Sequence, residues 1–248
     1  SHYLGSFKWR QKYATNQLAP EEMKCPFKED KPRICDKNFY YAMEDVLMDR
    51  VAKRGFKWNV TRPPLIIGFA PHNVYNMMTP LAAYAVICKE LDEPFIFPGG
   101  PIFYNQVYKT HANADVLADC MFWEVTQPNA ANQVFNITNG DEVRWRWMWK
   151  AIAKYFGIKV EDPKESISMQ KWAMDKEETW RKIADKYNLK CGELTKLANF
   201  WFVDIYFKCP VTDFLSTTKI REFGYTKYLD SKKGILTVLD EIREQKYI

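Results

Sequence analysis

The spacing of apolar residues along the chain predicts several helices. In residues 38–54 the apolar side chains of Tyr40, Met43, Leu47 and Val51 recur every three or four positions, which places them on one face of a helix. Gly157 is expected to end a tryptophan-rich helix, because glycine tolerates the left-handed backbone of a C-cap. Helical patterns cover residues 77–91, 115–125, 143–156 and 232–245, and pieces of helix are expected over 165–207.

Short apolar runs between these helices predict strands. Residues 56–60 alternate apolar and polar side chains, and Arg62 with the two prolines after it ends the run, since a residue before proline avoids helical backbone. Further runs lie at 65–69, at 94–100, where two glycines close a turn, and at 133–138. Strands that alternate with helices favour an α/β fold with parallel pairing.

The amino-acid composition limits which classes of molecule the protein is expected to bind. The 248 residues are 47% hydrophobic and 27% charged, as in an ordinary globular protein. The net charge of +5 is too weak and too evenly spread to argue for nucleic acid. The longest apolar stretch, 77–88, is shorter than the roughly 20 residues that cross a bilayer, so no membrane partner is expected.

Cysteines and histidines indicate the compartment. The six cysteines and three histidines show no metal-binding spacing, so no metal site is expected. The first residues lack the apolar core of a signal peptide. We therefore expect reduced, mostly buried thiols in a cytoplasmic protein.

Aromatic residues are abundant: 9 Trp, 14 Tyr and 16 Phe. So many rings indicate either an apolar pocket or a thick core, and composition does not choose between the two. In the basic, tryptophan-rich segment 144–150, Trp145 and Trp149 are four residues apart and share a helix face. That face is expected to enter the core rather than to bind nucleic acid.

Common catalytic and nucleotide-binding motifs are absent from the sequence. It contains no G-x-G-x-x-G turn, no P-loop, no G-x-S-x-G and no H-E-x-x-H. Local motifs therefore leave the function open.

Several longer segments of the sequence are similar to a known protein family. They are His2–Phe7, Asn38–Asp45 (Asn-Phe-Tyr-Tyr-Ala-Met-Glu-Asp), Arg62–Pro71, Phe135–Asp141 and Asn199–Asp204. Together they resemble the progesterone 5β-reductase/iridoid synthase family, a branch of the extended short-chain dehydrogenases. The similarity covers essentially the whole chain, and the Asn-Phe-Tyr-Tyr-x-x-Glu-Asp block is the most specific part.

The resemblance implies an α/β fold: the later part of a Rossmann-type parallel sheet with a smaller, mostly helical substrate-binding region. The first βαβ nucleotide-binding half is expected to be absent from this chain. Residues 1–248 are then one continuous unit. Sheet-forming segments are expected at about 38–75 and 130–140, and substrate-binding helical regions at about 76–130 and 141–230.

The resemblance also implies an NADPH-dependent oxidoreductase that reduces the C=C bond of an α,β-unsaturated carbonyl. Tyr40 matches the catalytic tyrosine, whose phenol, a weak acid at neutral pH, stabilises or protonates the enolate oxygen. Ser1 stands at the lysine position of the family motif and Ser6 at its proline. The usual Tyr-x-x-x-Lys spacing is absent, because Glu44 lies four residues after Tyr40.

Further site residues follow from the same resemblance. Leu65 stands where the family often has asparagine. The partner is expected to be a small apolar carbonyl compound, terpenoid or steroid-like, and a homodimer is left open. Positions on the NADPH side are Tyr40, Pro63, Ile66, Asn73, Val74 and Tyr75, and positions on the substrate side are Phe7, Leu65, Trp201 and Phe202.

Other interpretations remain open from the sequence. Tyr40 and the aromatic side chains can simply pack in the core, and Pro63 can simply end a strand. Two other functions compete: another extended short-chain enzyme, a carbonyl reductase or epimerase that uses Tyr40, or a non-catalytic fragment or pseudoenzyme that binds an apolar ligand. The polarity of the pocket around Phe7 and Phe202 would separate the first of these from an enone reductase.

Overall fold

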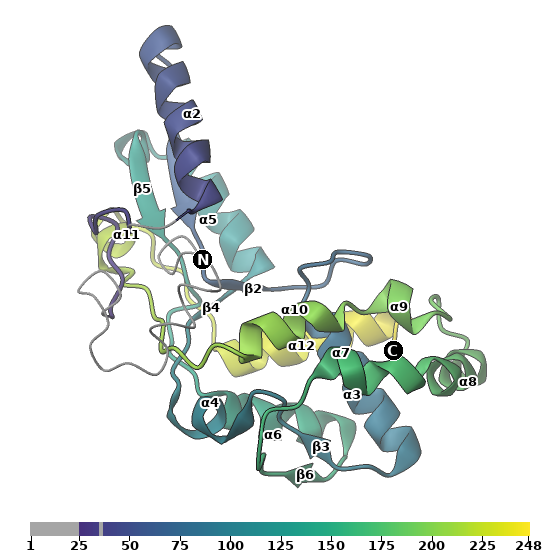
Figure 1. Ribbon diagram of the computed structural model, residues 1–248. Helices are drawn as coiled ribbons and strands as arrows, with labels where there is room; N and C mark the ends of the chain where they lie inside the picture. The colour runs from purple at the N-terminus through teal and green to yellow at the C-terminus, as the bar shows by residue number, and fades with distance from the viewer. Residues whose placement is uncertain (1–24, 35–36) are drawn as a thin grey trace. The chain divides into compact units, whose positions relative to one another are not determined.

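The computed structural model describes residues 25–34 and 37–248 (Figure 1). Its strands form three two-stranded sheets, β1–β5, β2–β4 and β3–β6, among many helices. The chain groups into two units, and each takes several separate segments of the sequence. Of the described residues, unit 1 contains 25–34, 37–66, 109–142 and 211–230, and unit 2 contains 67–108, 143–210 and 231–248. The single domain expected over 1–248 stays a prediction.

In unit 1 a pair of parallel strands carries the fold. Strand β1 (Asn59–Arg62) lies beside β5 (Gln133–Asn136), with Asn59 opposite Gln133 and Arg62 opposite Asn136. This confirms the parallel pairing that the alternation of strands and helices predicts. Helices α5 (Ala114–Thr126) and α11 (Thr218–Glu222) belong to the same unit. Its buried cluster consists of Val116, Cys120, Ala130, Phe135, Ile137, Ile220 and Tyr225.

Hydrogen bonds and a proline explain where strand β1 begins and ends. The predicted strand began at residue 56, whereas the ladder begins at Asn59. Before that point Trp58 donates its backbone N–H to the side chain of Asn132 at 3.1 Å and accepts the backbone N–H of Asn132 at 2.7 Å. Asn132 has a positive φ of 62°, outside strand geometry. At the other end Pro63 has no N–H to continue the ladder, as expected.

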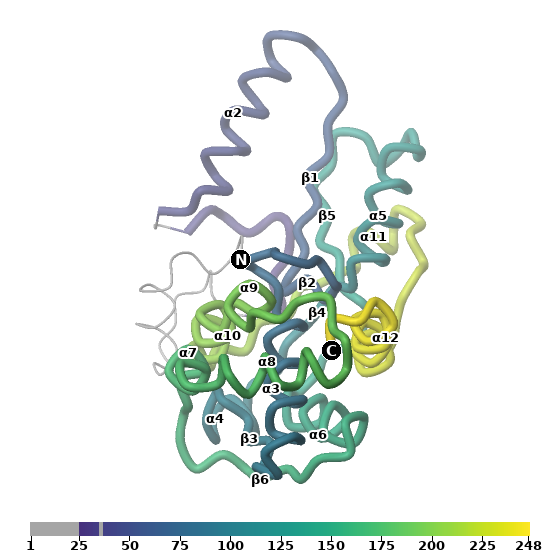
Figure 2. The backbone as a smooth tube through the Cα atoms, turned by 90° about the vertical axis from the view of Figure 1, so that its right-hand side faces the viewer, coloured from purple at the N-terminus to yellow at the C-terminus, as the bar shows by residue number. Residues whose placement is uncertain are grey.

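Helix α2 (Phe39–Arg54) follows the predicted range. The Asn38 side chain caps it by accepting the backbone N–H of Tyr40, and Gly55, with φ of 68°, ends it in left-handed backbone. Figure 2 shows α2 rising and the chain turning back into β1. None of its residues is buried, and Tyr40 is 38% exposed. The alternative that Tyr40 is a core aromatic is therefore wrong for this structure.

Unit 2 is mainly helical. Helix α3 (Met78–Leu91) packs against α6 (Trp145–Phe156) and α12 (Ser231–Glu244). On α6 Trp145 and Trp149 are fully buried while Trp147 is 53% exposed, so the expected core face of this helix is confirmed. Gly157, with φ of 67°, ends α6 as predicted.

The turn expected after residues 94–98 continues into a helix, α4 (Gly100–Gln106). Gly100 has a φ of 75°, and a Cβ at this position would lie 2.6 Å from Ser166 Oγ, so only glycine fits. The other elements are β2 (Leu65–Ile67), β3 (Phe95–Ile96), β4 (His111–Asn113), β6 (Val160–Glu161), α7 (Met169–Trp172), α8 (Glu177–Tyr187), α9 (Leu194–Leu197), α10 (Phe200–Phe207) and the 3₁₀ turns η2 (Pro128–Ala130) and η3 (Ala173–Asp175). No helix in the described part of the chain has the length and apolar character needed to span a membrane.

A buried carboxyl group in unit 1 makes stability depend on pH. Glu124 accepts hydrogen bonds from Thr61 Oγ1 at 2.6 Å and from Cys120 Sγ at 3.6 Å. Burial raises its pKa above the usual value. Above the ordinary carboxyl pKa the folded state then holds more protons than the unfolded state. The free energy of unfolding therefore falls as pH rises through the folded pKa.

Replacing Glu124 by glutamine is expected to raise the free energy of unfolding at pH 7 and to flatten its fall above pH 4.5, because glutamine carries no charge to bury. Denaturant unfolding measured at several pH values checks this. Glu222→Gln, at an exposed position of the same unit, is the control. Parallel pH curves for Glu124→Gln and the unchanged protein would contradict the expectation.

Candidate functional site

Tyr40 lies in a groove between α2 and β1, which we call the α2–β1 groove. Its volume is about 400 Å³. Pro63 lines it directly after β1, so the groove reaches the carboxyl end of a parallel strand, where α/β proteins usually bind ligands. The lining residues are Tyr40, Met43, Glu44, Leu47, Asn59, Val60, Thr61, Arg62 and Pro63.

An ion pair crosses this groove. Glu44 Oε1 lies 2.9 Å from Arg62 Nη2, and the two side chains are only 14% and 9% exposed. The other carboxylate oxygen of Glu44 lies 3.3 Å from Arg33 Nη2. Arg62 also donates from Nη1 to the backbone carbonyl of Glu29 at 3.3 Å. Helix α2 and strand β1 are thus joined by charged groups beside Tyr40.

Two other predicted site residues of unit 1, Leu65 and Ile66, closely follow Pro63 in the sequence but do not line the α2–β1 groove. Leu65 and Ile66 belong to β2, which pairs with β4. Leu65 is half-buried and Ile66 is 43% exposed. The structure therefore brings Tyr40 together with Pro63, and does not bring Leu65 or Ile66 to the same groove. Phe7 lies outside the described residues.

Unit 2 holds a second group of predicted positions. In the loop before α3, the Asn73 side chain accepts the backbone N–H of Tyr75 at 2.9 Å. The ring of Tyr75 meets the ring of Phe202 on α10 edge to face, with centroids 5.7 Å apart. The Val74 carbonyl accepts a hydrogen bond from Asn199 Nδ2 at 2.9 Å. The loop 73–75 and α10 thus form one cluster, and Trp201 beside it is 45% exposed.

Sequence reasoning missed several residues that hold these positions. Asn76 is buried; its Nδ2 donates to the Gly68 carbonyl at 3.1 Å, and its Oδ1 accepts the backbone N–H groups of Met78 and Thr79. An asparagine directly before a helical pattern is a recognisable capping signal. Arg62 and Asn199 carried no local signal of their partners.

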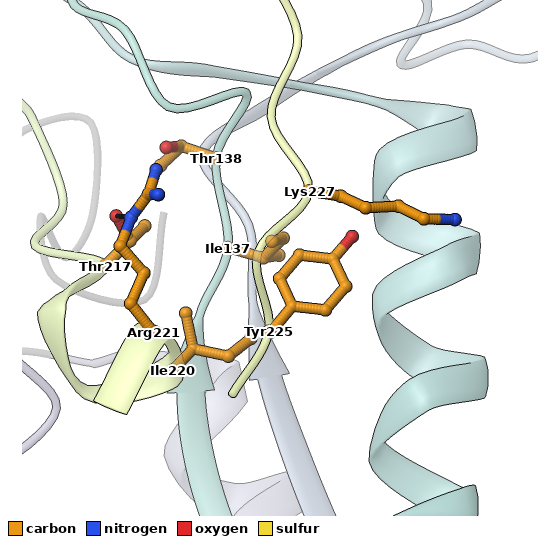
Figure 3. Close-up of a pocket in the computed structure, with 7 residues that line it drawn as sticks. All are labelled: Ile137, Thr138, Thr217, Ile220, Arg221, Tyr225 and Lys227. Carbon is orange, nitrogen blue, oxygen red and sulfur yellow. Dashed lines mark hydrogen bonds between the residues drawn. The ribbon is translucent and has the colours of Figure 1, made fainter. Parts of the chain in front are cut away.

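Figure 3 shows a second, smaller hollow in unit 1. It has no room for a water molecule. Arg221 Nε donates to Thr217 Oγ1 at 3.4 Å, while Lys227 points to α5, where it pairs with Asp119. This hollow therefore offers no space for a ligand. Its lining consists of Ile137, Thr138, Thr217, Ile220, Arg221, Tyr225 and Lys227.

Curated proteins similar to this chain come from plants. It is 34% identical over 250 residues to (S)-8-oxocitronellyl enol synthase from Catharanthus roseus, covering 100% of this chain and 62% of the relative. It is 37% identical over 238 residues to the protein of the same name from Antirrhinum majus, covering 95% and 60%. It is 30% identical over 251 residues to 3-oxo-Delta(4,5)-steroid 5-beta-reductase from Arabidopsis thaliana, covering 100% and 62%. The chain thus spans about three fifths of the length of these relatives.

Solved structures show the fold. UDP-glucose 4-epimerase from Thermotoga maritima matches with a TM-score of 0.57 at 15% identity, over 88% of this chain and 57% of that one. RMD from Pseudomonas aeruginosa, complexed with NADPH, matches with a TM-score of 0.57 at 14% identity, over 89% and 60%. The expected fold is confirmed: Rossmann-like α/β with parallel strands, corresponding to a C-terminal portion of the relatives. Residues 10–248 match the model of the PRISE-like Rossmann-fold domain, and the chain therefore belongs to this family, as the sequence motifs indicated.

Proposed function

We propose that the protein carrying this chain reduces the C=C bond of a small α,β-unsaturated carbonyl compound, with NADPH as the hydride donor. The observation that carries the proposal is the place of Tyr40, which lines the α2–β1 groove together with Pro63 at the carboxyl end of a parallel strand. The names of the relatives, an enol synthase and a steroid 5β-reductase, support this reaction class. The proposed setting is the cytoplasm, because the cysteines of the described residues are free thiols.

Tyr40 supplies the polar chemistry of the proposed reaction. When hydride reaches the β-carbon, negative charge develops on the carbonyl oxygen of the substrate. The Tyr40 hydroxyl donates a hydrogen bond, or its proton, to that oxygen. A donor of this kind is worth about 3–4 kcal/mol in a transition state. The 38% exposure of Tyr40 leaves the side chain open to a ligand.

The substrate is proposed to be apolar around its single oxygen. Trp201 is 45% exposed and Phe202 is half-buried, and both lie on α10. In unit 1, Leu65 is a half-buried aliphatic side chain at the position where the family often has asparagine. Apolar side chains at these family positions suit terpenoid or steroid-like carbonyl compounds.

The family resemblance supports a proposal for the nicotinamide end of the cofactor. The positions proposed for it in unit 1 are Pro63, which directly follows β1, and the exposed Ile66. Those proposed in unit 2 are Asn73, Val74 and Tyr75, which are all exposed to solvent. The sequence holds no glycine-rich turn for the pyrophosphate. The proposal therefore concerns this chain together with a nucleotide-binding half of the kind that the family resemblance implies.

Replacing Tyr40 by phenylalanine tests the proposal. We expect the rate of enone reduction to fall at least about tenfold, since one oxyanion donor is lost, with NADPH affinity unchanged. NADPH consumption with an enal or enone substrate measures the rate, and NADPH fluorescence measures the affinity.

An exposed tyrosine of the same unit provides a matched control. Tyr228 is 76% exposed and does not line the groove, and Tyr228→Phe is expected to leave turnover within about twofold. Near-normal turnover in Tyr40→Phe would rule out the role proposed for Tyr40.

A further inference from the structure

We propose that Glu44 and Arg62 form a positioning clamp that holds Tyr40 at the carboxyl end of β1. The inference rests on the function proposed for Tyr40 and adds to it a pair of charged residues that set the place of the phenol. Neither residue is taken to touch the substrate, so both act through Tyr40.

The clamp connects the helix face of Tyr40 to the end of the strand. Tyr40 and Glu44 are four residues apart on α2, so they project from the same face, and both line the α2–β1 groove. Arg62 is the last residue of β1 and directly precedes Pro63. The 2.9 Å contact between Glu44 and Arg62 therefore ties the helical turn after Tyr40 to the strand end.

Burial of apolar side chains does not hold α2 in place in this structure. None of its residues is buried, and Phe39, Met43 and Val46 are each more than 60% exposed. Its first turns are instead joined to the rest of unit 1 by polar groups. Besides the clamp, Arg33 lies 2.7 Å from Asp45 and 3.3 Å from Glu44. In this structure, polar contacts therefore join this end of the helix to the rest of unit 1.

At the end of β1, a second hydrogen bond fixes the direction of the Arg62 guanidinium independently of Glu44. Its Nη1 donates to the Glu29 carbonyl at 3.3 Å. The Glu29 side chain in turn accepts the backbone N–H of Asn136 at 2.8 Å, and Asn136 is the residue opposite Arg62 in the strand pair. A guanidinium with its direction already set loses little freedom when it binds a carboxylate. The strand end thus presents a preorganised cation to α2.

Position matters because catalysis by a hydrogen-bond donor depends on distance. A displacement of about 1 Å in a reacting group can cost up to about a hundredfold in rate. Glu44→Gln removes the negative charge that Arg62 binds while keeping the size and the polarity of the side chain. The loss of the ion pair should let the Tyr40 turn move away from the strand end.

The test compares Glu44→Gln with a matched variant on the same helix. Asp49 forms an exposed ion pair with Lys53 at 2.8 Å, and Asp49→Asn removes an equivalent charge away from the groove. In the protein that contains this chain and its nucleotide-binding half, we expect Glu44→Gln to lower kcat about fivefold to tenfold, with KM for NADPH within about twofold. Asp49→Asn should leave both constants unchanged.

A double variant separates positioning from a general structural role. If Glu44 acts through the Tyr40 hydroxyl, Glu44→Gln should cost nothing further in the Tyr40→Phe background. An equal loss of kcat in both backgrounds, or a kcat within about twofold of normal in Glu44→Gln alone, would overturn the clamp. If Glu44→Gln does not fold at the assay temperature, Arg62→Lys, which keeps the charge and loses the planar fork, is judged by the same two criteria.

A readout without turnover distinguishes failure of the clamp from failure of the proposed function. The protein is labelled with 3-fluorotyrosine, and the ¹⁹F signal of residue 40 is identified by its loss in Tyr40→Phe. The clamp predicts that Glu44→Gln shifts or broadens this signal and that Asp49→Asn does not. If Tyr40→Phe keeps normal turnover, the function of Tyr40 is disproved, and an unmoved signal in Glu44→Gln then disproves the clamp as well.

Discussion

Replacing Asp213 by asparagine is expected to lower the free energy of unfolding by about 3–5 kcal/mol, because it breaks an ion pair with the buried ammonium group of Lys109. The Lys109 side chain is 4% exposed and that of Asp213 is 16% exposed, with 3.1 Å between Lys109 Nζ and Asp213 Oδ2. Little water can reach the ammonium group to replace the lost partner. Denaturant unfolding followed by circular dichroism measures the change.

Two further variants make this expectation specific. Glu90 pairs with Lys186 at 3.0 Å on the surface, and Glu90→Gln should leave stability unchanged, since water replaces the partner there. Replacing both residues of the pair, as Lys109→Met with Asp213→Leu, should recover most of the loss, because the two charges are then removed together. A loss below about 1 kcal/mol in Asp213→Asn, the size expected for a surface pair, would show that the pair is solvated in solution.

Replacing Trp149 by alanine is expected to cost a similar amount, about 3–5 kcal/mol, because it opens a large cavity in unit 2. The indole is fully buried and stacks on the ring of Phe95, with centroids 3.9 Å apart and the planes at 5°. Its Nε1 also donates to the Phe95 carbonyl at 3.0 Å. Thermal and denaturant unfolding of the chain measure the loss.

The same helix offers the control. Trp147 lies two residues away on α6 and is 53% exposed, so Trp147→Ala should have little effect on stability. Trp149→Phe keeps most of the ring and removes the hydrogen bond, so it should fall between the two alanine variants. Equal losses in Trp147→Ala and Trp149→Ala would contradict the packing described for α6.

The helices of this chain could be predicted because their apolar spacing is long and regular. Residues 143–156 show it best: Trp145 and Trp149 are buried and Trp147 faces solvent, as the four-residue spacing requires. Helix α4 was missed because its seven residues begin with glycine and proline, which are also typical of a turn. The predicted start of β1 was three residues too early. Trp58 forms hydrogen bonds with Asn132, a residue far away in the sequence, and these bonds take the place of the strand ladder before Asn59.

Only those residues of the candidate site that belong to a family motif could be predicted from the sequence. The family block identified Tyr40, and the same resemblance identified Pro63; the structure places both in one groove. The partners that hold the site could not be predicted. The Glu44–Arg62 pair joins residues 18 positions apart, and Asn199 reaches the Val74 carbonyl across 125 positions. Neither spacing follows a helix or strand period, so no local pattern reveals it.

The interleaving of the two units has a consequence for biosynthesis. The chain passes from one unit to the other after residues 66, 108, 142, 210 and 230, so both units receive their last segments after residue 210. Unit 1 takes α11 from residues 211–230, and unit 2 takes α12, which packs on α3 and α6, from residues 231–248. A ribosome delivers domains in order, and the N-terminal one usually folds first. Here unit 1 is incomplete until residues 211–230 have left the ribosome, and unit 2 is incomplete until residues 231–248 have left it, so the earlier segments must wait, partly unpaired, for their partners.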